Sequence, residues 1–89
     1  MSVPIVEVRV IDILVYLFVD GVQQPMCWTG DERHNADTFA ATILRQRYEA
    51  YNREQRLFRR SGVTFDSFAV GVSERLRTRA VGFGQQGVL

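Results

Sequence analysis

The stretch VPIVEVRVIDILVYLFV, residues 3–19, holds most of the β-branched apolar side chains in this chain of 89 residues. Residues 5–10 alternate in a way that is typical of a strand with one buried face, here formed by Val6, Val8 and Val10. Residues 13–19 are apolar on both faces, so this half requires cover on both sides of a sheet. Asp12 separates the two halves. Because strands usually span about 3–10 residues, we expect a bend or bulge near residues 11–12.

The dipeptide Asp20-Gly21 follows directly, and Asp-Gly between apolar runs is a strong signal for a tight β-hairpin. A two-residue hairpin places Val19 opposite Val22. The same register places Tyr16 opposite Pro25. Because proline has no N–H group to donate, the second strand of this hairpin is expected at an edge of the sheet.

A polar segment, residues 29–35, leads into one clear amphipathic helix, which we expect to run for about 24 residues from a cap at Asn35 or Asp37. Its apolar stripe recurs mostly every three or four residues and comprises Ala40, Leu44, Tyr48, Tyr51 and Phe58, widened by Phe39, Ile43 and Leu57. Gly62 is expected to end the helix, because glycine readily adopts the left-handed conformation of a C-cap.

Residues 63–72 alternate again and predict a further strand. Residues 74–82 contain two competing signals. A strand is favoured by the alternation of Arg75, Arg77 and Arg79. A short helix beginning after Ser73 is favoured by the spacing of Val72, Leu76, Ala80 and Phe83. We expect a strand.

These elements predict an α+β fold with a mostly antiparallel sheet, in the order β-β-α-β-β, and one long amphipathic helix packed on one face. A single domain is expected to span residues 1–83, followed by a flexible C-terminal tail at residues 84–89. The composition, 46% hydrophobic and 24% charged, is that of a globular protein and excludes disordered and collagen-like classes.

Targeting and membrane segments are not expected. No basic residue precedes the apolar stretch, and Glu7, Arg9 and Asp12 interrupt it, so it resembles neither a signal peptide nor a spanning helix. We therefore expect a cytoplasmic protein without a membrane partner. The single cysteine, Cys27, is consistent with a reducing compartment and is expected in the core.

Charge is unevenly distributed along the chain, although the net charge is only +1. Residues 1–44 contain two arginines and six acidic residues, whereas residues 45–89 contain nine arginines and four acidic residues. All eleven basic residues are arginine. This usage fits bidentate contacts to phosphate or carboxylate groups, and it equally fits a biased genome.

No arrangement of residues predicts catalysis. Hard ligands and an imidazole gather only at Asp31, Glu32, His34 and Asp37, which lack the repeated Cys/His spacing of a zinc site. No glycine-rich phosphate loop opens a helix. We therefore expect no enzyme activity, no metal and no cofactor.

The apolar stretch at residues 13–19 suggests a partner. One helix covers one face of a sheet, and exposing several large apolar side chains would cost a small domain much of its stability. A second copy of the chain is the simplest cover, because symmetric dimers are the commonest oligomers. We expect a homodimer whose interface includes Ile13, Val15, Leu17 and Val19.

Three functions follow as hypotheses. The leading one is a non-enzymatic homodimer that presents an arginine-rich helix face and strand to an acidic protein surface, using Arg53, Arg56, Arg60, Arg75, Arg77 and Arg79. The second is nucleic-acid binding, because arginines on one face of the strand at residues 75–79 would stand about 6.7 Å apart and follow a phosphate backbone. The third is a carrier or enzyme with a small apolar ligand held between helix and sheet beside Tyr48 and Tyr51.

Overall fold

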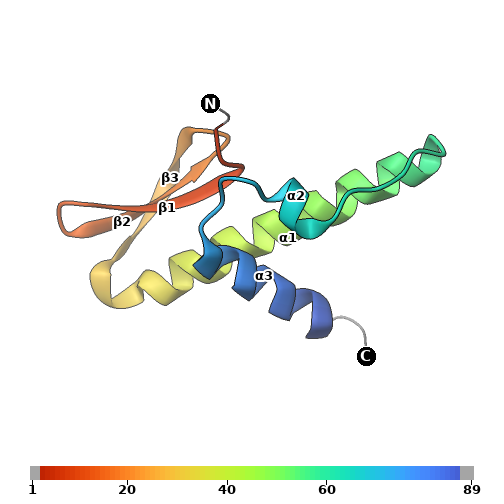
Figure 1. Cartoon of the computed structure of the whole chain (residues 1–89). Helices are drawn as coiled ribbons and strands as arrows, with labels where there is room; N and C mark the ends of the chain where they lie inside the picture. Colours follow the sequence, from red (N-terminus) through yellow and green to blue (C-terminus); the bar gives the residue numbers. More distant parts are fainter. Residues whose placement is uncertain (1–2, 87–89) are drawn as a thin grey trace.

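The computed structural model describes residues 3–86, which form a three-stranded antiparallel sheet followed by helices (Figure 1). The elements are β1 (Val6–Ile11), β2 (Leu14–Val19), β3 (Val22–Thr29), the 3-10 helix η1 (Gly30–Glu32), α1 (Arg33–Leu57), α2 (Phe65–Phe68) and α3 (Glu74–Gln86). The α+β class is therefore confirmed. The predicted β-β-α-β-β order is wrong, because all three strands precede the helices.

The stretch at residues 3–19 forms two antiparallel strands and not one bent strand. Ile11 pairs with Leu14, so Asp12 and Ile13 form the tight turn between β1 and β2. Asp12 has a φ of 57°, a left-handed conformation that aspartate tolerates better than most residues. The polar residue at the centre of the apolar stretch thus marks a reversal of the chain.

The second hairpin is confirmed at Asp20-Gly21, where both residues have positive φ, 53° and 81°. Val19 pairs with Val22. The predicted pairing of Tyr16 with Pro25 is wrong, because the register shifts and Tyr16 pairs with Cys27. Because of this shift, Pro25, which has no N–H group to donate, lies outside the regular ladder of hydrogen bonds. As predicted, β3 is an edge strand of the sheet, whose strand order is β1-β2-β3.

The core lies between one face of the sheet and the helices. α1 contacts all three strands, and small side chains on its buried face allow a close approach. α3 packs against α1, and the segment before it completes the core. The buried core cluster comprises Val6, Leu17, Ala40, Ala41, Leu44, Ala69, Val72, Leu76 and Ala80.

Neither strand predicted after α1 is present. Residues 63–72 contain the single helical turn α2 followed by a turn at residues 69–71. The Thr64 hydroxyl caps α2 by accepting a hydrogen bond from the N–H of Ser67 at 3.2 Å. Residues 74–82 belong to α3. The four-residue spacing was the decisive signal, because it places Val72, Leu76 and Ala80 together in the core.

The C-terminal prediction is only partly covered by the described residues. α3 continues to Gln86, and residues 87–89 of the predicted tail lie outside the described part of the chain. Of the helices described, none combines the length and the apolar character needed to cross a membrane.

Candidate interaction surface

The C-terminal half of α1 extends away from the sheet (Figure 1). The buried residues of this helix all lie between Ala36 and Leu44. Beyond them, Tyr48, Tyr51 and Asn52 of the helix contact the returning chain at Val63, Phe65 and Phe68. We call residues 45–60 the basic arm, because this segment contains six arginines and two glutamates.

Aromatic packing between α1 and α2 supports the basic arm. The ring of Tyr48 lies 5.1 Å from that of Phe65 and 5.5 Å from that of Phe68, measured between centroids. Tyr51 lies 5.5 Å from Phe68, and the hydroxyl of Tyr48 donates a hydrogen bond to the carbonyl of Val63 at 3.1 Å. The two tyrosines predicted to line a ligand pocket between helix and sheet therefore pack between α1 and α2 instead.

A close backbone approach explains the glycine at position 62. The Asn52 side-chain oxygen accepts a hydrogen bond from the N–H of Val63 at 3.3 Å. A Cβ atom on Gly62 would lie 2.7 Å from that oxygen. Gly62 does not end the helix as predicted. It allows residues 58–64 to fold back along α1.

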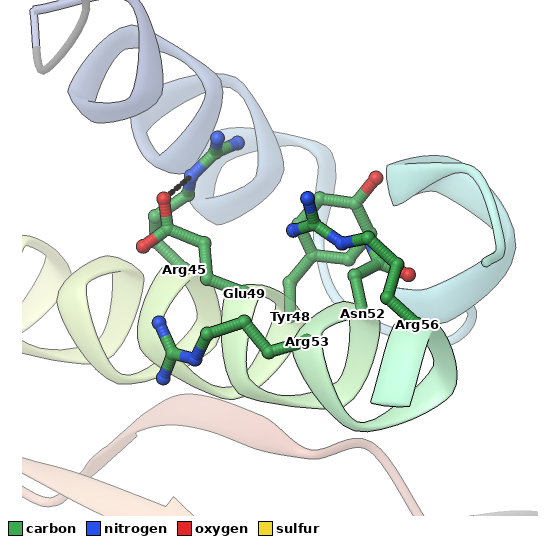
Figure 2. Close-up of a pocket in the computed structure, with 6 residues that line it drawn as sticks. All are labelled: Arg45, Tyr48, Glu49, Asn52, Arg53 and Arg56. Atoms are coloured by element: carbon green, nitrogen blue, oxygen red, sulfur yellow. Dashed lines mark ion pairs between the residues drawn. The ribbon is translucent and has the colours of Figure 1, made fainter. Parts of the chain in front are cut away.

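Two arginines of the basic arm have acidic partners. Arg47 donates to both carboxylate oxygens of Asp20, at 3.2 and 2.9 Å, and thereby ties the arm to the β2–β3 turn. Nε of Arg45 lies 3.4 Å from the carboxylate of Glu49, the i,i+4 pair drawn as a dashed line in Figure 2.

The other four arginines have no carboxylate partner among residues 3–86: Arg53, Arg56, Arg59 and Arg60. Figure 2 shows the guanidinium groups of Arg53 and Arg56 apart from the Arg45–Glu49 pair. Arg53 and Arg56 help to line an open polar pocket of about 330 Å³ on the arm, together with Arg45, Tyr48, Glu49 and Asn52.

Two large apolar side chains are exposed among these arginines. Leu57 is 80% exposed and Phe58 is 62% exposed, although both were predicted to extend the buried stripe of the helix. The guanidinium carbon of Arg60 lies 5.5 Å from the centroid of the Phe58 ring. The end of the basic arm therefore combines positive charge with apolar surface.

The arm ends in a left-handed C-cap formed by arginine. Arg59 has a φ of 56°, and the N–H of Arg60 donates to the carbonyl of Gln55 at 2.8 Å, the six-to-one hydrogen bond of a Schellman motif. Glycine usually occupies this position, because a left-handed conformation costs other residues about 1–2 kcal/mol.

Replacing Arg59 with glycine is expected to raise the free energy of unfolding by about 0.5–1 kcal/mol, because the released strain exceeds the extra entropy of the unfolded chain. Urea denaturation followed by circular dichroism measures this change. Arg60→Gly is the matched control, since Arg60 lacks positive φ, and it is expected to give no gain. A loss of stability in Arg59→Gly would contradict the strained cap.

The three arginines predicted to form a strand ribbon lie on α3 and contact neighbouring residues. Arg75 donates to both carboxylate oxygens of Asp37, at 2.9 and 3.1 Å, and Asp37 is only 4% exposed. Arg79 donates to the Thr38 hydroxyl at 3.0 Å. Arg77 donates to a backbone carbonyl, that of Val72, at 3.1 Å. The strand ribbon is therefore wrong.

The ion pair between Asp37 and Arg75 joins α1 to α3 and was missed in the sequence. A signal for it was present, because Asp37 lies three, four and seven residues before Ala40, Ala41 and Leu44 and so falls on the buried face of the helix. An acidic residue on such a face requires a cationic partner.

The four residues predicted for a dimer interface occupy different surroundings. Ile13 lies in the β1–β2 turn and is 82% exposed. Val15 and Leu17 are fully buried on the sheet face that α1 covers. Val19 is half-buried. The exposed cysteine also differs from the prediction, because Cys27 lies on an edge strand opposite Tyr16.

Other arrangements offer less for chemistry. Within residues 3–86, no group of three His, Cys, Asp or Glu side chains is placed to hold a metal ion. A second open pocket, of about 390 Å³, lies on α1 and is lined by residues that include Phe39 and Ile43.

The chain matches no known protein family, and no characterised protein or solved structure is significantly similar to it. The functional argument therefore depends on the basic arm itself.

Proposed function

We propose that this protein is a non-enzymatic interaction protein that binds an acidic protein surface through its basic arm. The observation that supports this most directly is the combination at the end of α1, where four arginines without carboxylate partners among residues 3–86 accompany the exposed side chains of Leu57 and Phe58. Arginine and aromatic residues are enriched in protein interfaces and at their energetic hot spots.

The charge of the arm favours an acidic partner. Six arginines and two glutamates give residues 45–60 a net charge of +4, on a protein whose total is +1. Only Arg45 and Arg47 are paired with carboxylates in the described part of this segment. Carboxylates of a partner would supply the bidentate acceptors that guanidinium groups prefer.

The apolar part of the arm favours a protein over a nucleic acid. Leu57 offers nothing to a phosphate backbone, and it is 80% exposed. A protein interface places such side chains at its centre and the charged groups at its rim. In addition, Arg75 and Arg79 of α3 already donate to side chains of α1, so they add little to an extended basic track.

The strained cap supports the same proposal. Arg59 occupies a position where glycine would be more stable, and strained residues gather at functional sites. Retaining arginine there keeps a fourth positive charge beside Phe58. We infer that binding, and not folding, accounts for the arginine.

Binding is tested by fluorescence anisotropy with a labelled synthetic peptide that alternates glutamate with leucine and phenylalanine. Arg56→Gln and Phe58→Ser are each expected to weaken binding of this peptide by about three- to tenfold, because each removes one interface contact. Phe58→Ser is expected to leave the weaker binding of polyglutamate unchanged, because that probe has no apolar side chains.

Arg33→Gln is the matched control, because Arg33 lies at the opposite end of α1 and the substitution removes the same charge. It is expected to bind like the unchanged protein. Single-stranded DNA is titrated in parallel at several salt concentrations. Tighter binding of DNA than of the peptide, with a steep loss as salt rises, would overturn the proposal in favour of nucleic-acid binding.

A further inference from the structure

The polar pocket on the basic arm is rich in hydrogen-bond donors. It has a volume of about 330 Å³, and it is lined by Arg45, Tyr48, Glu49, Asn52, Arg53 and Arg56. A guanidinium group can only donate hydrogen bonds, and it stays positively charged. Three arginines and one glutamate give the lining a net charge of +2. A ligand of this pocket must therefore supply acceptors and negative charge.

Two of the lining side chains are held in place by the returning chain. The hydroxyl of Tyr48 donates to the carbonyl of Val63 at 3.1 Å, and the side-chain oxygen of Asn52 accepts from the N–H of Val63 at 3.3 Å. Both side chains are half-buried. Because the oxygen of Asn52 is engaged in this way, the group that remains for a ligand is the amide nitrogen, which only donates. The pocket thus combines a fixed neutral donor with longer charged ones.

The arginines of the pocket are available to a ligand. Arg53 and Arg56 have no carboxylate partner among residues 3–86. Nε of Arg45 lies 3.4 Å from the carboxylate of Glu49, but it makes no hydrogen bond within the described part of the chain. Figure 2 shows the three guanidinium groups separated from one another around the pocket. The single acidic group of the lining therefore leaves most of the arginine donors unused.

A phosphorylated side chain matches this lining better than a carboxylate does. A phosphoserine or phosphothreonine carries a charge of about −1.5 to −2 and three strong acceptor oxygens, whereas a carboxylate carries one charge on two oxygens. Clusters of arginine are a recurring means of recognising phosphorylated peptides. The volume lies at the lower end of the range of ligand pockets, about 300–1,000 Å³, so a phosphoryl group and part of its side chain can enter.

The surroundings of the pocket favour a phosphorylated protein over a nucleic acid. Arg56 lines the pocket, and the next two residues are Leu57 and Phe58, which are 80% and 62% exposed. A peptide can place its phosphoryl group in the pocket and its apolar side chains against these two residues. The backbone of a nucleic acid carries one charge per phosphate and offers no apolar side chain to Leu57.

We propose, building on the function proposed for the basic arm, that this pocket binds a phosphorylated serine or threonine of the acidic protein partner. Arg53 and Arg56 form charge-assisted hydrogen bonds with the phosphoryl oxygens, and the amide nitrogen of Asn52 donates a further one. Glu49 opposes the bound anion and competes with it for Arg45. The affinity for the phosphoryl group is therefore set by the balance between these arginines and Glu49.

Fluorescence anisotropy tests the site with three labelled peptides that alternate glutamate with leucine and phenylalanine and carry phosphoserine, glutamate or serine at one central position. The protein is expected to bind the phosphoserine peptide about 5- to 20-fold more tightly than the glutamate peptide, and the serine peptide most weakly.

Two substitutions in the pocket are expected to move this preference in opposite directions. Asn52→Asp is expected to reduce it to about twofold or less, because aspartate still accepts from the N–H of Val63 but replaces the donor with a negative charge. Glu49→Gln is expected to raise it by about two- to fivefold, because it removes the only acidic group of the lining. A preference that stays the same in both folded variants would overturn the site.

Asn35→Asp is the matched control, because it makes the same chemical change on α1 outside the basic arm. It is expected to leave the preference unchanged. Equal affinity of the unchanged protein for the phosphoserine and glutamate peptides would overturn the phosphoryl site and leave the function proposed for the arm intact. Binding of neither peptide would overturn both.

Two competitors distinguish other sources of phosphate. Inorganic phosphate is expected to displace the phosphoserine peptide only at millimolar concentrations, because it makes none of the contacts with Leu57 and Phe58. Displacement at micromolar concentrations would assign the pocket to a free anion and overturn the phosphorylated partner. Single-stranded DNA that displaces the phosphoserine peptide at lower concentration than the unlabelled peptide itself would overturn it in favour of nucleic-acid phosphates.

Discussion

Replacing Leu17 with alanine is expected to lower the free energy of unfolding by about 3 kcal/mol, because the change leaves a cavity in a fully buried site. Leu17 lies on the central strand β2 and is 0% exposed in a single chain. Leu17 belongs to the same core cluster as Leu44 of α1 and Leu76 of α3, so the cavity would lie in the core between the sheet and the helices. Urea denaturation followed by circular dichroism measures the loss.

Ile13→Ala is the control for Leu17→Ala. Ile13 is 82% exposed in the β1–β2 turn, so its truncation is expected to change the free energy of unfolding by less than about 0.5 kcal/mol. The cost at Leu17 is expected at every protein concentration, because the side chain is covered by its own chain. Equal effects at the two positions would contradict the burial of Leu17. A cost at Leu17 that vanishes on dilution would show that a second molecule covers this face.

Replacing Arg75 with methionine is expected to lower the free energy of unfolding by about 2–3 kcal/mol, because it leaves the carboxylate of Asp37 buried without its bidentate partner. This expected loss is smaller than that for a fully buried ion pair, because the Arg75 side chain is 43% exposed while that of Asp37 is 5% exposed. Methionine keeps the apolar stem of arginine, so the loss reports the charge. Thermal and urea denaturation both measure it.

Arg56→Met on the basic arm is the matched control. It is expected to change the free energy of unfolding by less than about 0.5 kcal/mol, because Arg56 is exposed and has no carboxylate partner among residues 3–86. Combining Arg75→Met with Asp37→Leu removes both charges and is expected to recover much of the loss. An Arg75→Met variant as stable as Arg56→Met would contradict the role of the ion pair in holding α3 on α1.

The features that the sequence predicted well are those decided by local chemistry. Asp20-Gly21 requires positive φ at two successive residues, which few structures other than a tight hairpin satisfy. The long helix follows from the spacing of Ala40 and Leu44, both fully buried. The alternation at residues 5–10 correctly assigned Val6 to the buried face.

The features that failed depended on how the elements pack together and not on local residue types alone. A turn at Asp12-Ile13 was not predicted, because isoleucine is a poor turn residue and the tight turn is stabilised by the pairing of β1 with β2. The alternation of Arg75, Arg77 and Arg79 favoured a strand, whereas burial of Leu76 and Ala80 against α1 selects a helix. The sequence did not show which face of β2 the long helix covers, so Val15 and Leu17 were assigned to a dimer interface, whereas both are fully buried within the chain.

Of the residues proposed for the interaction surface, three arginines were also named from the sequence: Arg53, Arg56 and Arg60. The sequence did not predict the exposure of Leu57 and Phe58. Periodicity shows which face of a helix a residue lies on, but it does not show how far along the helix that face is covered by the rest of the protein. Nor did it identify the cap at Arg59, since an arginine gives no local signal for positive φ.

The most direct test of the basic arm is an NMR titration of the isotope-labelled protein with the peptide that alternates glutamate with leucine and phenylalanine. The amide shifts that change are expected to gather in residues 45–60, with Leu57, Phe58 and Arg59 among the largest. Shift changes confined to the sheet, or none at concentrations where the peptide stays soluble, would contradict binding through the basic arm.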